Sequence, residues 1–130
     1  MAIASIRPAA VAGHFYPSDT ELLRAQVSEL LTAALPAEEL TAAPKAVVVP
    51  HAGYLYSGAI AANGYASLRG LRGTIRRVVL LGPPHRMPVS GFALAAAQGF
   101  STPLGVVGVD RAAWSMLQTQ PDVVVDDRPH

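Results

Sequence analysis

Two short runs of the chain are rich in β-branched and aliphatic residues, with no polar residue alternating among them. They cover residues 45–49 and 76–81, and proline or glycine follows each of them at once. Runs of this kind are typical of strands that are buried on both faces of a parallel sheet. The sequence therefore predicts two buried strands in these positions.

Helical spacing of apolar residues predicts one helix before the first of these strands and another after it. Ser18 and Glu21 fit a capping box, and the apolar positions that follow recur at helical spacing over residues 18–35. Small and apolar side chains over residues 57–68 predict a second, closely packed helix, although Gly64 costs it about 1 kcal/mol relative to alanine. A strand, a helix and a second strand in this order form a βαβ unit.

The rest of the chain predicts shorter helices and strands. Residues 7–17 are rich in turn-forming residues and predict an irregular N-terminal arm, whereas Asp110 is placed to cap a short helix that holds Trp114 and Leu117. Further strands are predicted at residues 92–97, 105–109 and 123–125. The expected fold class is α/β, with a central, mostly parallel or mixed sheet flanked by helices.

Composition narrows the class of protein. The 130 residues suffice for one domain, and the net charge of +1 gives no electrostatic reason to expect a nucleic acid or an anionic membrane as partner. The sequence contains no cysteine, which excludes disulfides and thiolate metal ligands within it and makes the cytoplasm the default location. No stretch approaches the roughly 18 apolar residues of a membrane-spanning helix.

Two histidines follow the two predicted buried strands. His51 comes after the first strand and His85 after the second. A right-handed crossover makes the strands parallel, so both histidines are expected at the sheet edge where α/β proteins bind ligands. Two neutral imidazoles there could share one divalent metal ion. The alternative interpretation, that both are loop histidines hydrogen-bonded to backbone, stays open.

Other candidate residues surround the first histidine. Tyr54 and Tyr56 are expected either to line the pocket, where a phenol donates a hydrogen bond or acts as an acid, or simply to pack. His14 either reaches the same sheet edge or is an exposed loop histidine. Gly53 and Gly58 are interpreted as turn residues, because the sequence has no phosphate-binding glycine motif.

Three motifs together resemble the Memo family, whose bacterial members are named AmmeMemoRadiSam system protein B. They are R-P-A-A-V-A-G-H-F-Y-P at 7–17, V-V-V-P-H-A-G-Y-L-Y-S-G at 47–58 and L-L-G-P-P-H at 80–85. The resemblance covers essentially the whole chain. It implies a fold like that of LigB-type class III extradiol dioxygenases and a metal site in which His51 and His85 are two of the ligands. It also implies iron or copper rather than zinc, and redox or dioxygenase-like chemistry. With the tyrosine next to the first histidine, the candidate catalytic residues are His51, His85 and Tyr54.

The chain departs from the family pattern in two respects. The family's usual G-P-S-H-H is replaced by G-P-P-H-R at residues 82–86, which removes a hydroxyl and a second histidine and adds Arg86. Family members are also about twice as long. The resemblance therefore implies that residues 1–130 are the N-terminal half of one α/β domain, incomplete at its C-terminus. A further histidine and a cysteine of the metal site would belong to the other half.

An apolar surplus agrees with that expectation. Apolar residues make up 51% of the chain and charged residues only 15%, against about 25% charged residues in typical soluble proteins. Apolar faces in such a chain are expected to need cover from further polypeptide or from a partner.

Three functions are open at this stage. The first is a metal-dependent oxidoreductase or dioxygenase-like enzyme. The second is a non-catalytic module that binds a peptide or small molecule, in an assembly with the AMMECR1-type and radical-SAM proteins that the family name implies. The third is a partial domain with no function of its own.

Overall fold

The computed structural model describes residues 5–34 and 44–130. The chain divides into two compact units: residues 10–76 form one, and the N-terminal residues up to Ala9 join residues 77–130 in the other. The first unit is helical, whereas the second combines strands with a short helix. Helices together with parallel and antiparallel strands confirm the α/β class.

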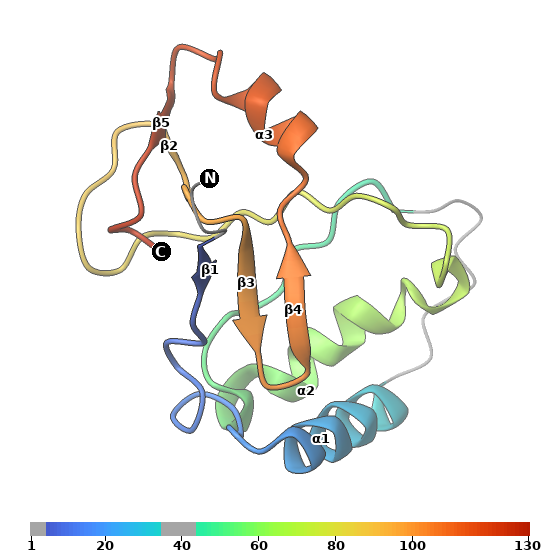
Figure 1. The fold of residues 1–130 in the computed structure, drawn as a ribbon. Coiled ribbons are helices and arrows are strands. Elements are labelled where there is room, and N and C mark those ends of the chain that lie inside the picture. The colour runs from blue at the N-terminus through green and yellow to red at the C-terminus, as the bar shows by residue number, and fades with distance from the viewer. Residues whose placement is uncertain (1–4, 35–43) are drawn as a thin grey trace. The chain divides into compact units, whose positions relative to one another are not determined.

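Two helices build the unit of residues 10–76. Helix α1 (Thr20–Ala33) packs against helix α2 (Tyr54–Ala66), as Figure 1 shows, and a 3-10 turn at Arg69–Leu71 follows α2. Gly58 lies inside α2, where a β-carbon would come within 3.0 Å of a methyl group of Leu30 on α1. The interpretation of Gly58 as a turn residue was therefore wrong, because its lack of a side chain serves the close approach of two helices.

Both helices begin at residues other than those predicted. The N-cap of α1 is Asp19, whose carboxylate accepts a hydrogen bond from the backbone N–H of Leu22 at 2.9 Å, so the cap falls one residue after Ser18. The predicted end of this helix at residue 35 lies outside the described residues. Helix α2 begins at Tyr54, three residues before the predicted start, with Gly53 as its N-cap. A glycine offers no capping side chain, so the sequence carries little signal of that start.

Two small sheets belong to the other unit. The first has the order β1–β3–β4, in which β1 and β3 are parallel while β3 and β4 form an antiparallel hairpin (Figure 1). The second pairs β2 and β5 in parallel. Their bounds are Ile6–Arg7 for β1, Phe92–Leu94 for β2, Gly99–Thr102 for β3, Gly105–Gly108 for β4 and Val123–Val125 for β5. The sequence predicted β2, β4 and β5 but not β1 or β3.

Helix α3 (Arg111–Leu117) confirms the predicted cap. The Asp110 carboxylate accepts a hydrogen bond from the backbone N–H of Ala113 at 3.0 Å and pairs with the Arg77 guanidinium at 2.6 Å. Both interactions hold the pKa of Asp110 below its ordinary value. The indole of Trp114 donates to the carbonyl of Ala95 at 2.9 Å and so ties the helix to the segment that follows β2.

The two predicted buried strands are not strands in the structure. Residues 46–50 and 75–84 belong to no helix or strand, and most of their apolar side chains are exposed, with Val48 at 97% and Leu80 at 85%, whereas Val47 and Val49 are half-buried. Their composition favours extended backbone, but a strand also needs a partner for its N–H and C=O groups. The described strands pair only among themselves, so the predicted βαβ unit does not form.

Candidate functional site

His51 lies in the loop that leads into α2. The loop is tied to the helix by Ser57, whose hydroxyl donates to the carbonyl of Ala52 at 2.8 Å and which is only 7% exposed. The His51 residue itself is exposed. A buried serine therefore fixes the backbone next to an accessible imidazole.

Replacement of Ser57 by alanine is expected to lower the free energy of unfolding by about 1 kcal/mol, because the Ala52 carbonyl loses its donor in a partly buried place. Hydrogen exchange of backbone amides in the loop around His51 should also accelerate. The control is Ser115→Ala, which removes an exposed hydroxyl bonded to Arg111 within α3. Equal losses of stability in the two variants would contradict the role given to Ser57.

His85 lies in the other unit, in a bend after the extended segment of residues 75–84, and it too is exposed. Within the two described ranges, no group of three or more His, Cys, Asp and Glu side chains is placed to hold a metal ion. The described residues thus do not make a complete metal site by themselves. The shared position of His51 and His85 stays a prediction.

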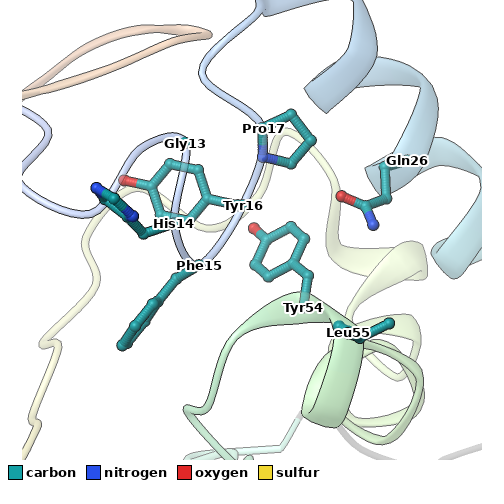
Figure 2. Close-up of a pocket in the computed structure, with 8 residues that line it drawn as sticks. All are labelled: Gly13, His14, Phe15, Tyr16, Pro17, Gln26, Tyr54 and Leu55. Atoms are coloured by element: carbon teal, nitrogen blue, oxygen red, sulfur yellow. The ribbon is translucent and has the colours of Figure 1, made fainter.

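A cavity lies within the unit of residues 10–76. It has a volume of about 300 Å³ and lies between the turn of residues 13–17, Gln26 of α1 and the first residues of α2 (Figure 2). The backbone N–H of Tyr54 donates to the carbonyl of Phe15 at 2.8 Å. At Gly53 a β-carbon would come within 3.3 Å of the same oxygen, so glycine allows the turn to approach the helix start closely.

Aromatic rings form much of the cavity wall. The rings of Tyr16 and Tyr54 have centroids 5.7 Å apart and are tilted by 44°. Burial raises the pKa of Tyr54, and the neighbouring phenols of Tyr16 and Tyr65 add to the effect. Its hydroxyl therefore stays protonated at neutral pH and remains a hydrogen-bond donor.

The structure assigns the candidate residues to different surroundings. Tyr54 and His14 line the cavity, whereas Tyr56, two residues further along α2, is 83% exposed and does not line it. Sequence reasoning missed Tyr16 and Gln26. Gln26 is one of the polar positions of an amphipathic helix, and nothing in its sequence neighbourhood distinguishes it from an exposed glutamine.

Comparison with known proteins places this α/β chain in a family. The profile described as "Memo-like protein" matches residues 7–130, so the chain belongs to the Memo-like family. A MEMO1 family protein of Aquifex aeolicus is 36% identical over 96% of the chain. A MEMO1 family protein of Methanopyrus kandleri is 40% identical over 93% of it, and Protein MEMO1 of Danio rerio is 35% identical over 85%.

The relatives are longer than this chain. The matched part is 44% of the Aquifex aeolicus protein, 44% of the Methanopyrus kandleri protein and 36% of the Danio rerio protein. The chain therefore spans less than half the length of these curated relatives. No helix in the part of the chain that the structure describes is long and apolar enough to cross a membrane.

Proposed function

We propose that the chain binds a divalent transition metal through His51 and His85, with iron or copper preferred over zinc, and that it works in the cytoplasm. The observation that carries the proposal is that both histidines belong to motifs inside the region matched by the Memo-like family. Both residues are exposed, and His51 lies in a loop that Ser57 holds in place. Bound iron or copper would supply redox or dioxygenase-like chemistry.

Two imidazoles leave most of a metal's coordination positions unfilled. A tetrahedral site needs two more ligands, and an Fe(II) dioxygenase site pairs two histidines with a carboxylate. Because no third ligand clusters with them in the described residues, we propose that further ligands lie elsewhere. In a protein as long as the relatives, the remaining sequence would supply them.

Metal titration tests the proposal directly. Fe(II), Cu(II) and Zn(II) are titrated into the chain and into the variants His51→Ala and His85→Ala. We expect each variant to bind iron and copper at least about tenfold more weakly, since loss of a ligand costs no less than loss of a group that orients one. His14→Ala is the matched control, because it removes an exposed histidine outside the proposed pair. Unchanged affinity in both test variants would rule the site out.

A second function is favoured by the exposed apolar segment at residues 78–81. Its four side chains are between 69% and 85% exposed, which is typical of a surface that another polypeptide covers. We therefore propose, as the alternative, a non-catalytic module that binds a peptide or partner in an assembly with AMMECR1-type and radical-SAM proteins. Partner binding that a chelator does not change would favour the module over the metal-dependent enzyme.

A further inference from the structure

The backbone of residues 76–84 is open over its whole length. The segment belongs to no helix or strand, and none of its backbone N–H and C=O groups bonds to another residue that the structure describes. The last backbone hydrogen bond before it joins the N–H of Ile75 to the carbonyl of Leu71 at 3.3 Å. All nine residues of the segment are exposed. Such a backbone can enter the cleft of a protease as an added strand without breaking an element of the fold.

The segment also begins where one compact unit of the chain ends. Residues 10–76 form one unit, and Arg77 is the first residue of the long stretch that belongs to the other. A cut inside a unit requires local opening of that unit, which costs free energy. A cut at the end of a unit avoids this cost. Cleavage next to residue 76 is therefore easier than cleavage within either unit.

Two adjacent arginines, Arg76 and Arg77, occupy this position. The Arg77 guanidinium pairs with the Asp110 carboxylate at 2.6 Å. Arg76 is exposed and has no hydrogen bond or ion pair with any residue in the described ranges. Trypsin-like serine proteases select an arginine or lysine through an aspartate in their specificity pocket. The Arg76 side chain can enter that pocket directly, whereas Arg77 has first to leave Asp110.

The other basic residues lie in places that are less open to such a protease. Lys45 is exposed, but Val47, two residues further on, is half-buried against α2. Arg86 lies in a bend, next to the half-buried Met87. The remaining ones lie in helices or in the turns after α2, or precede a proline, whose missing N–H and fixed φ hinder cleavage. In helices and turns are Arg24, Arg69, Arg72 and Arg111, and before a proline are Arg7 and Arg128.

We propose that the Arg76–Arg77 bond is a processing site, at which a trypsin-like serine protease divides the chain into residues 1–76 and 77–130. The hydrolysis consumes one water molecule: the C–N bond breaks, Arg76 keeps a carboxylate and Arg77 gains an ammonium group. His51 belongs to the first piece and His85 to the second, so the cut ends any function that needs both on one chain. The cleavage itself does not rest on the proposed metal site. A polypeptide that covers residues 78–81 would shield the bond.

A short pairing joins the N-terminal residues to the strands of the second piece. Strand β1 pairs with β3 over two residue pairs, and the N–H of Gln98 donates to the carbonyl of Ser5 at 2.8 Å. The Arg7 guanidinium donates to the carbonyl of Asp127 at 3.3 Å. In the intact chain the covalent connection keeps β1 at a high effective concentration beside β3. After the cut this pairing joins two molecules and is far smaller than a stable interface, so we expect the pieces to separate on dilution.

Limited digestion with trypsin tests the site on the folded chain. Intact masses are followed over time, and we expect the first two products to end at Arg76 and to begin at Arg77. Size-exclusion chromatography should then resolve the two pieces. The same digestion in urea is the control for structure, because cleavage of the unfolded chain should lose this preference. A first cut elsewhere, or equal rates at all basic residues of the folded chain, would overturn the site. Co-elution of the two pieces would overturn their separation.

Two variants identify the arginine that enters the protease pocket. Arg76→Gln should abolish the cut after residue 76 and slow the first cut in the segment about fivefold, leaving the slower cut after Arg77. Asp110→Asn keeps a capping side chain but loses the charge, so it should speed the cut after Arg77 by up to about fivefold. Arg86→Gln is the matched control, an exposed arginine outside the segment whose loss should leave the first cut unchanged. Circular dichroism verifies that each variant is folded. Unchanged digestion of both Arg76→Gln and Asp110→Asn would contradict the assigned bond.

Discussion

Replacement of Gly91 by alanine is expected to lower the free energy of unfolding by about 3 kcal/mol or more. Gly91 has a φ angle of +78°, in the left-handed region that disfavours side chains. An added β-carbon would also lie closer than 3.0 Å to the carbonyl oxygen of Asp122. That oxygen accepts the backbone hydrogen bond of Phe92 at 2.8 Å, at the point where β2 begins to pair with β5. The clash can be relieved only by pulling the two strands apart.

Gly73 provides a matched control for the conformational part of this effect. Its φ angle is +79°, but an added β-carbon would have nothing within 4 Å. Gly73→Ala is therefore expected to cost about 1 kcal/mol, from backbone strain alone. Urea unfolding followed by circular dichroism measures both variants. Equal losses would show that the Asp122 contact contributes nothing to the stability of the parallel pair.

Local signals in the sequence were enough to predict the elements that depend on local interactions. Asp110 caps α3 as predicted because an N-cap acts within one turn of its own helix. The strand at Val123–Val125 was also predicted at its observed bounds, since three consecutive valines favour extended backbone strongly. The cap needs no distant part of the chain, whereas the strand also needs its partner β2.

The predictions that failed completely were those that depended on distant partners. The runs at residues 45–49 and 76–81 have the composition of buried strands, yet a strand forms only where another strand offers hydrogen bonds. Their exposed valine and leucine side chains agree with the apolar surplus of the sequence. The composition of such a run predicts extended backbone, but it does not identify the segment that would pair with it.

Gly64 of α2 is another position whose role depends on a distant part of the chain. Gly64 was predicted only to weaken the helix, but a β-carbon there would come within 2.5 Å of the Val49 side chain. The glycine therefore lets the extended segment before His51 lie against α2. The sequence shows that a glycine at this position lowers the stability of the helix. The contact with Val49 that compensates for this loss is visible only in the folded unit.

The cavity was partly predictable from the sequence. Tyr54 was a candidate from its place in the histidine motif, and the structure puts it in the cavity wall with His14. Gln26 reaches the same cavity from another helix, about 28 positions earlier in the chain, and only the packing of α1 on α2 brings it there. The stability of that packing therefore determines whether the cavity exists.

Leu23 is the side chain in α1 on which this packing depends most. It is 3% exposed, the lowest exposure in the apolar core of the described residues. Leu23→Ala is expected to lower the free energy of unfolding by about 2–4 kcal/mol, because it removes buried methyl groups and leaves a void. Gln26 lies three residues further along the same helix face, so the cavity that it lines should loosen too.

Leu22→Ala separates this effect from helix propensity. Leu22 is the neighbouring residue on the same helix, but it is 64% exposed, and its contribution to the N-cap comes from its backbone N–H. Its replacement by alanine is expected to change the free energy of unfolding by no more than about 0.5 kcal/mol. Thermal unfolding is measured on both variants. If Leu23→Ala costs no more stability than Leu22→Ala, the burial of Leu23 does not stabilise the packing of α1 on α2.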